Sequence, residues 1–137
     1  MLIPNIRKYR IALVDGAPFL CHMAISSHWM VHYLNAGMTE DAGKRAEEAR
    51  AMADFEADFA KRHATGFAAL RERIGLEYFA IDCAESRDGN LLVFEADTAM
   101  IIHSMDPPEM FPYKAAQMEK AYAAFQTMLR RAVALPA

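Results

Sequence analysis

Three acidic residues, Asp82, Glu95 and Asp97, flank a short turn signal in the second half of the chain. The pair Asp88-Gly89 predicts a two-residue β-hairpin loop, because the favoured turn needs positive φ at both central positions. Counting outward from that loop places Asp82 opposite Glu95, with Asp97 on the same face. Carboxylates held side by side repel each other, so the cluster favours a bound cation. Hard oxygen ligands of this kind suit Mg²⁺ or Mn²⁺.

The same count predicts which hairpin side chains face the protein core. The predicted core face holds five apolar residues: Phe79, Ile81, Cys83, Leu92 and Phe94. The predicted acidic face holds three further residues that leave room above the carboxylates: Ala80, Ala84 and Val93. The alternative interpretation is a hairpin with one solvated face, on which acidic residues are ordinary and bind no metal.

The stretches Gly75-Leu-Glu-Tyr-Phe-Ala-Ile-Asp82 and Phe94-Glu95-Ala-Asp97 border this turn. They resemble the metal-binding hairpin of ATP-grasp ligases, a superfamily that includes D-alanine–D-alanine ligase, glutathione synthetase and the ribosomal-protein glutamate ligases. In this resemblance Asp82 matches the first metal ligand and Glu95 the bridging glutamate. Asp97 stands at a position that asparagine usually holds.

Two upstream stretches extend the resemblance over roughly residues 7 to 100. Lys8-Tyr9-Arg10-Ile-Ala-Leu-Val-Asp15-Gly16 is similar to a conserved superfamily strand, and His32-Tyr-Leu-Asn35-Ala-Gly37 is loosely similar to the stretch that follows it. The resemblance implies that Arg10 is a catalytic and cofactor-binding residue that stabilises phosphate charge. His32 and Asn35 are cofactor-binding candidates for the same cleft, and His103 is a candidate contact to the acceptor. Arg10 as an ordinary surface arginine, and His103 as an incidental loop histidine, are the alternatives.

ATP-grasp ligases join a carboxylate to an amine or thiol at the expense of ATP, with Mg²⁺ or Mn²⁺ between the phosphates. They are usually two to three times the length of this chain. The resemblance therefore implies a C-terminal lobe that binds metal and nucleotide phosphates but is inactive alone. Its expected partner is a missing N-terminal lobe or, in a homodimer, a second copy. The alternative is a non-catalytic, self-associating interaction domain derived from a truncated ATP-grasp protein.

Composition places bounds on these possibilities. The chain has 137 residues, 54% of them hydrophobic, which fits one domain spanning 1–137. A net charge of −3 gives no overall attraction to nucleic acid. No apolar run approaches the roughly 18 residues of a membrane span. Cys21 and Cys83 lack paired spacing, so we expect reduced, buried thiols in a cytoplasmic protein.

Periodicity predicts the strands and helices of an α+β domain. The resemblance to the C-terminal half of the ATP-grasp fold implies an antiparallel sheet with helices packed on one face. We expect strands over 7–14 and 18–25, and a last helix over 113–133 whose apolar stripe holds Met118, Tyr122, Phe125 and Leu129. The segment 26–38 is predicted to be a connector that packs Trp29 against the sheet. The alternative is a helix that aligns His28 with His32 for metal binding.

A long helical stretch is predicted between Thr39, as N-cap, and Gly75, as C-cap, with a bend or break at Gly66. Its predicted buried face holds six residues at helical spacing: Met52, Phe55, Phe59, Phe67, Leu70 and Ile74. The charged residues between them, including Glu47 and Glu48, are predicted to form a solvated face. A proline-rich loop, 98–112, is predicted to separate the hairpin from the last helix.

Overall fold

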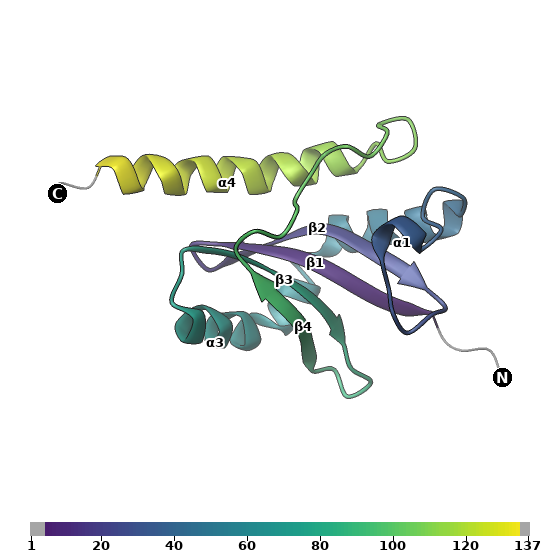
Figure 1. Ribbon diagram of the computed structural model, residues 1–137, viewed down its shortest axis with the longest axis horizontal. Coiled ribbons are helices and arrows are strands. Elements are labelled where there is room, and N and C mark those ends of the chain that lie inside the picture. The colour runs from purple at the N-terminus through teal and green to yellow at the C-terminus, as the bar shows by residue number, and fades with distance from the viewer. Residues whose placement is uncertain (1–4, 135–137) are drawn as a thin grey trace.

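The structure, a computed structural model that describes residues 5–134, is built around one four-stranded antiparallel sheet (Figure 1). The strands are β1 (Ile6–Val14), β2 (Ala17–Ser26), β3 (Tyr78–Glu85) and β4 (Leu91–Asp97), in the spatial order β2-β1-β3-β4. The helices are the 3₁₀ turn η1 (Tyr33–Asn35), α1 (Ala42–Asp54), α2 (Phe59–Arg62), α3 (Ala64–Ile74) and α4 (Lys114–Ala134). The predicted α+β class with an antiparallel sheet is confirmed.

The first hairpin joins β1 to β2 through a tight two-residue turn. Asp15 and Gly16 both adopt positive φ, 52° and 83°, and Val14 pairs with Ala17. This is the backbone that a two-residue hairpin requires. A bulge after Arg10 then shifts the register, so that Arg10 lies opposite His22. The predicted strand boundaries are confirmed to within a residue.

The second hairpin reaches the predicted pairing by a different route. Only Gly89 has positive φ in its turn, and a hydrogen bond from Ser86 N to Asn90 O closes a three-residue loop. That loop moves the register by one residue, and a bulge between Asp82 and Cys83 moves it back. Asp82 therefore lies opposite Glu95 as predicted. The first shift comes from a loop that is one residue longer than the Asp-Gly signal implies, and the bulge compensates for it.

Between the loop and the bulge, the predicted side-chain orientation in β4 is wrong. Leu91 and Val93 pack against the core, and Val93 is therefore not on the acidic face. Leu92 and Phe94 are 50% and 55% exposed instead of buried. A one-residue slip in a strand exchanges its two faces, which accounts for the difference.

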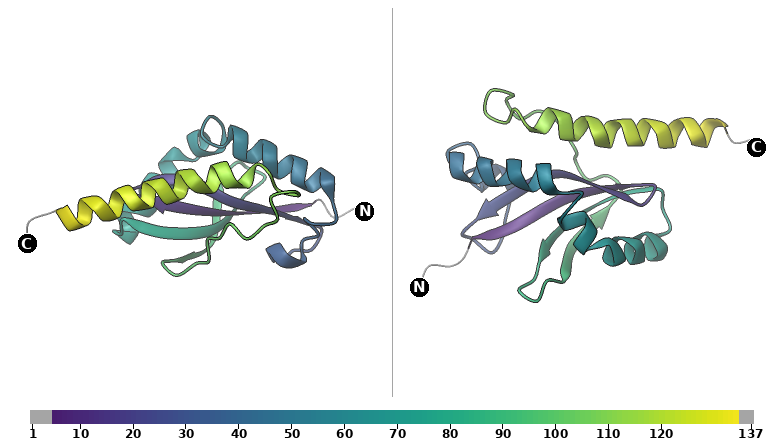
Figure 2. Two further views of the ribbon diagram at one scale, coloured as in Figure 1. Left: turned by 90° about the horizontal axis from the view of Figure 1, so that it is seen from above. Right: turned by 180° about the vertical axis from the view of Figure 1, so that it is seen from behind.

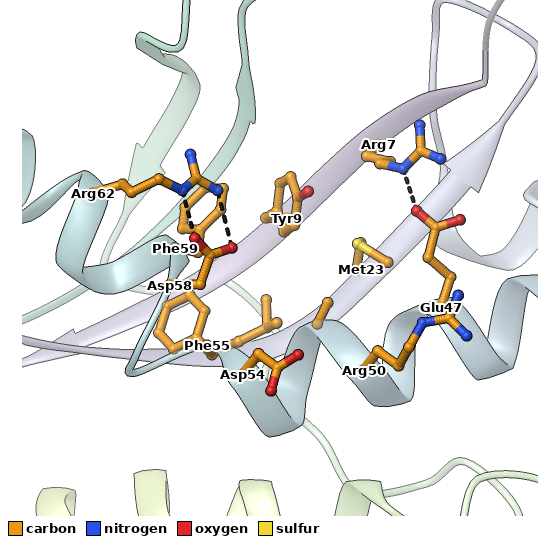
Figure 3. A pocket seen from close by; sticks show the side chains of 12 residues that line it. Arg7, Tyr9, Met23, Glu47, Arg50, Asp54, Phe55, Asp58, Phe59 and Arg62 are labelled. Atoms are coloured by element: carbon orange, nitrogen blue, oxygen red, sulfur yellow. Dashed lines mark hydrogen bonds and ion pairs between the residues drawn. The ribbon is translucent and has the colours of Figure 1, made fainter.

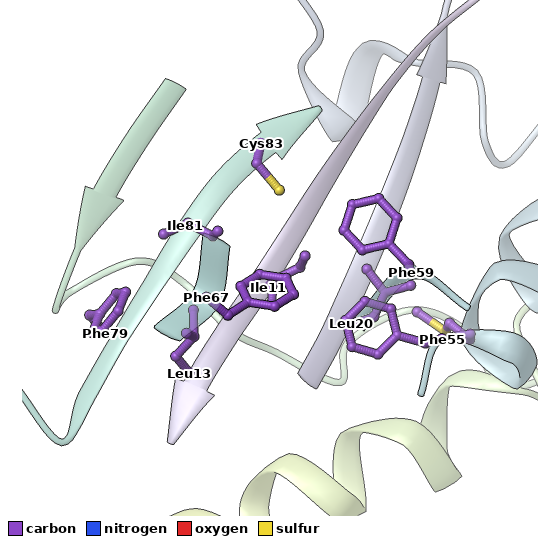
Figure 4. Packing of buried hydrophobic residues seen from close by; sticks show 10 residues of the cluster. Ile11, Leu13, Leu20, Phe55, Phe59, Phe67, Phe79, Ile81 and Cys83 are labelled. Carbon is purple, nitrogen blue, oxygen red and sulfur yellow. The ribbon is translucent and has the colours of Figure 1, made fainter. Parts of the chain in front are cut away.

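Helices α1, α2 and α3 cover one face of the sheet and enclose the main core (Figure 4). Met52, Phe55, Phe59 and Phe67 are buried there as predicted, with Leu70 and Ile74 packed against them. Figure 4 shows the phenylalanine rings lying over the apolar residues of β1, β2 and β3.

The ends and breaks of this helical stretch differ in part from the prediction. Asp41, not Thr39, caps α1 by accepting hydrogen bonds from the amides of the first turn. The first break follows α1, where Ala60 N donates to Phe55 O across one residue more than an α-helical turn spans. Gly66 lies inside α3 rather than at a break. Gly75 is the left-handed C-cap that was predicted, with φ of 71°.

Helix α4 lies on the opposite face of the sheet, so the prediction that all helices pack on one face is wrong (Figures 1 and 2). Met118 of α4 is buried with Ala12 and Cys21, whose strand neighbours Ile11 and Leu20 point into the main core. Side chains alternate between the faces of a strand, so α4 covers the reverse side. The stripe of α4 turns slightly from the prediction, since Met128 is buried and Leu129 is 47% exposed.

The connector after β2 turns outward instead of packing on the sheet. Trp29 is 80% exposed, so its predicted contact with the sheet is wrong. His28 and His32 lie outside any helix, which removes the four-residue alignment considered for a metal pair. The loop between β4 and α4 contains turns but no helix or strand, as its prolines predicted. Within residues 5–134, no helix combines the length and apolarity needed to cross a membrane.

Candidate functional site

Four polar residues form a single row across all four strands, on the face opposite α1–α3. Arg10 of β1 pairs with His22 of β2 on one side and with Asp82 of β3 on the other. Asp82 in turn pairs with Glu95 of β4. Asp97, two residues beyond Glu95, lies on the same face opposite a small alanine. The structure therefore brings Arg10 next to Asp82, with Glu95 and Asp97 one strand further on the same face.

Asp82 is held by two cations. Arg10 donates from Nε and Nη2 to the two carboxylate oxygens at 2.8 and 3.0 Å, and Lys8 Nζ donates at 2.8 Å. The Asp82 side chain is only 5% exposed. Burial by itself would raise its pKa, but the hydrogen bonds from Arg10 and Lys8 prevail and hold the pKa below its ordinary value. Asp82 is therefore ionised and fully engaged in this structure.

A cleft of about 650 Å³ opens beside this row and is called the basic cleft here. It is lined by residues from β1, β2, η1 and the loop before α4: Lys8, Arg10, His22, His32, Tyr33, Leu34, Asn35, Ile101, His103, Met105 and Asp106. Four candidates from the sequence therefore share one cleft, namely Arg10, His32, Asn35 and His103. Sequence reasoning missed Lys8 and His22.

A second hollow of about 410 Å³ adjoins the basic cleft and is called the acidic hollow here. Asp82 and Glu95 line it, and it shares Lys8 and His32 with the basic cleft. Its outer wall contains Trp29, together with the exposed Phe94. Cations and carboxylates thus border two connected spaces on one open face.

His22 is the most unusual group in the basic cleft. It is 7% exposed, and its Nε2 has no hydrogen-bond partner among the described residues. Burial, reinforced by the positive charges of Arg10 and Lys114, lowers its pKa to about 3. Its ring lies 4.4 Å from that of Tyr33. A neutral, buried imidazole whose Nε2 bonds nothing among the described residues thus lies opposite Arg10.

A buried polar network supports the basic cleft from below. Glu48 of α1 is fully buried and accepts hydrogen bonds from Met23 N at 2.9 Å and from the Tyr113 hydroxyl at 2.6 Å. Lys114 lies 3.2 Å from Glu48 and 2.7 Å from Asp106, and it also bonds the Tyr33 hydroxyl. Since Asp106 and Tyr33 line the cleft, α1 and α4 jointly fix its wall. The prediction that Glu48 lies on a solvated face is wrong.

The three predicted metal ligands differ in how exposed they are and in how many hydrogen bonds their carboxylates already accept. Glu95 is exposed, and Asp97 is exposed with one oxygen accepting from Ala99 N at 2.8 Å. Across residues 5–134, no three ligating side chains of histidine, cysteine or acidic type come close enough to hold a metal unaided. Glu95 and Asp97 can offer oxygens outward, whereas Asp82 must first leave Arg10 and Lys8.

A smaller groove of about 280 Å³ lies on the other side of the sheet, between β1 and α1–α2 (Figure 3). Its floor is the aromatic surface of Tyr9 and Phe59. Four of its charged residues pair with one another, Arg62 with Asp58 at 2.7 Å and Arg7 with Glu47. Because most of its charges are engaged in this way and it is the smaller space, the basic cleft is the stronger candidate site.

Cys21 and Cys83 are free and buried, which confirms that part of the cysteine prediction. Burial raises the pKa of Cys21 to about 11 and that of Cys83 to about 12, so both thiols stay protonated and unreactive.

No known family, curated protein or solved structure matches the chain.

Proposed function

We propose that the chain is the metal- and nucleotide-phosphate-binding lobe of an ATP-dependent ligase that joins a carboxylate to an amine or thiol. One observation supports this most, the row in which Arg10 lies between His22 and Asp82, with Glu95 beyond. Phosphoryl transfer depends mainly on positioning and charge neutralisation, and this row sets a forked cation beside carboxylates.

The polar residues of the site form two groups, one suited to phosphate and one suited to a metal ion. Arg10 and Lys8 face the basic cleft, where they would bind phosphate oxygens, and His32 and Asn35 offer further polar contacts at its rim. Glu95 and Asp97 would hold Mg²⁺ or Mn²⁺. Magnesium sites commonly combine one or two carboxylates with phosphate oxygens and water, which suits a site with two outward carboxylates. The bound ion would neutralise phosphate charge.

The test is Mn²⁺ titration in the presence of a non-hydrolysable ATP analogue, with free Mn²⁺ followed by electron paramagnetic resonance. Wild type should bind Mn²⁺, and Glu95→Gln should lose that binding. Asp88→Asn is the matched control, because it removes an exposed carboxylate from the turn of the same hairpin. Equal binding by wild type and Glu95→Gln would refute the ligand role of Glu95.

A second candidate function, a self-associating interaction domain, is favoured by the exposed apolar residues around the two spaces. Trp29 and Leu34 are 80% and 92% exposed, and Ile101 and Met105 across the basic cleft are 68% and 77% exposed. Apolar side chains gathered at one site usually mark a contact surface. Sedimentation of the chain at tens of micromolar as a monomer would count against this candidate.

A further inference from the structure

The Asp82 carboxylate lines the acidic hollow and already accepts the hydrogen bonds of Arg10 and Lys8 that an anionic ligand of the basic cleft would need. Arg10 presents its forked guanidinium to both oxygens of Asp82, the geometry with which arginine also binds phosphate. Lys8 completes the contact. The side chains of Arg10 and Lys8 are only 19% and 15% exposed. The two cations are therefore satisfied by an internal anion.

Two features indicate that the ion pairs of Asp82 with Arg10 and Lys8 are not the arrangement of the ligand-bound protein. Arg10 and Lys8 share the single carboxylate of Asp82, so these three side chains together carry a net charge of +1. His22, 93% buried and paired with Arg10 across the strands, has no partner for Nε2 within residues 5–134. Buried polar atoms are normally hydrogen-bonded, and an unpaired one in a cleft calls for an explanation such as a ligand.

Asp82 also borders open space into which its carboxylate can turn. Its neighbours on the same face of β3, Ala80 and Ala84, have small side chains, and the open space beside the carboxylate is the acidic hollow. Glu95 lies directly across the strand pair, and both carboxylates line the acidic hollow. A change of the Asp82 side-chain rotamer would turn its oxygens away from Arg10 and Lys8 and toward Glu95 in the acidic hollow.

We propose that Asp82 is an exchangeable counter-ion: a phosphate-bearing ligand replaces it on Arg10 and Lys8, and the released carboxylate joins Glu95 in holding a divalent cation. This inference rests on the proposed function and concerns the coupling of its two ligands. The cation alone must compete with Arg10 and Lys8 for Asp82, and the phosphate alone must displace a carboxylate. Each ligand removes the obstacle to the other, so the coupling is reciprocal.

The first experiment measures binding of inorganic pyrophosphate in EDTA by calorimetry, for wild type, Asp82→Asn and Glu95→Gln. Both substitutions remove one negative charge from the same row, but only Asp82 contacts Arg10 and Lys8. Exchange predicts that Asp82→Asn binds pyrophosphate about tenfold more tightly than wild type, the size of a typical coupling. Glu95→Gln should change the affinity by less than about threefold, because Glu95 bonds neither Arg10 nor Lys8 and no metal is bound in EDTA.

The second experiment keeps the proposal testable if Asp82→Asn fails to fold. Lys8→Gln removes one of the two cations that hold Asp82, and Mn²⁺ is titrated without any phosphate. We expect Lys8→Gln to bind Mn²⁺ several-fold more tightly than wild type and to bind pyrophosphate more weakly. Circular dichroism melting curves verify that each variant is folded.

The outcomes separate the inference from the function on which it rests. If both ligands bind but Asp82→Asn and Glu95→Gln gain equally, or Lys8→Gln leaves Mn²⁺ affinity unchanged, exchange is refuted and the proposed function stands. If wild type binds neither pyrophosphate nor Mn²⁺, even when both are present, the proposed function fails and the inference fails with it.

Discussion

Replacement of Glu48 tests the buried network that holds the basic cleft in shape. Glu48 is fully buried in α1 and accepts from Met23 N and the Tyr113 hydroxyl, with Lys114 at 3.2 Å. In Glu48→Leu the first two donors lose their acceptor, and each unsatisfied buried group costs about 1–3 kcal/mol. Lys114 keeps Asp106 at 2.7 Å. We expect a loss of about 3–5 kcal/mol, as for other broken buried pairs.

Glu48→Gln keeps the shape and most of the hydrogen bonds. Its carbonyl oxygen accepts from Met23 N, and its amide donates to the Tyr113 hydroxyl, which can act as an acceptor. Burial, although opposed by Lys114 and Tyr113, raises the pKa of Glu48, so ionising this carboxyl is less favourable in the folded state than in the unfolded chain. Removing the charge is therefore cheap, and we expect a loss of about 1 kcal/mol.

Urea unfolding followed by far-ultraviolet circular dichroism measures both losses. The signal of Trp29 is unsuitable, because this residue is already 80% exposed in the folded state. With an m-value of about 2 kcal/mol/M, Glu48→Leu should lower the midpoint by about 2 M. The control is Glu47→Gln in the next position, whose pair with Arg7 is partly exposed and worth below about 1 kcal/mol. A Glu48→Leu protein as stable as Glu48→Gln would refute the reasoning.

The remaining predictions concern pH, backbone conformation and association. Burial alone would raise the pKa of Glu85, but hydrogen bonds to Arg62 and His63 lower it, so its stabilising effect is present above the unfolded pKa and lost as pH falls through the folded one; acid titration of stability should be shallower in Glu85→Gln. Gly75→Ala should destabilise the protein by about 1 kcal/mol, because the residue has a φ of 71°; nothing lies close enough to add a steric clash. Gly66→Ala should stabilise it by about 0.5 kcal/mol, because Gly66 lies inside α3 at an ordinary helical φ. Thermal melting that ranks the two variants in reverse would be contrary evidence. The chain alone should self-associate without turning over ATP, and Trp29→Ser should weaken that association in light scattering.

The two hairpins show how far local sequence signals reach. The Asp15-Gly16 turn has the two positive φ values of a two-residue hairpin, and the strands beside it lie within one residue of the expected bounds. The Asp88-Gly89 signal predicts a hairpin but not its loop length, since Gly89 fits equally well after a type I turn. The pairing of Asp82 with Glu95 was predicted because a later bulge compensates for the longer loop. Bulges carry no short sequence signal, so the exposed side of Phe94 was not predictable.

The candidate site was predictable where it depends on alternation along one strand. Lys8 lies two residues before Arg10 and shares its face, so strand periodicity was a sufficient signal that was not used. His22 faces Arg10 only because of the bulge in β1–β2, and counting from the turn would have placed Cys21 there. Glu48 resembles a surface residue by type and spacing, and only the tertiary approach of β2 and α4 buries it.

The position of a bound Mn²⁺ ion tests the central claim most directly. Amide signals of the chain with substoichiometric Mn²⁺ and a non-hydrolysable ATP analogue report that position, because the ion broadens nearby resonances. The account predicts broadening centred on β4 at Glu95–Asp97 and on β3 at Asp82, extending to Arg10. Broadening centred instead on the groove beside Asp54 and Asp58, on the opposite side of the sheet, would contradict the account.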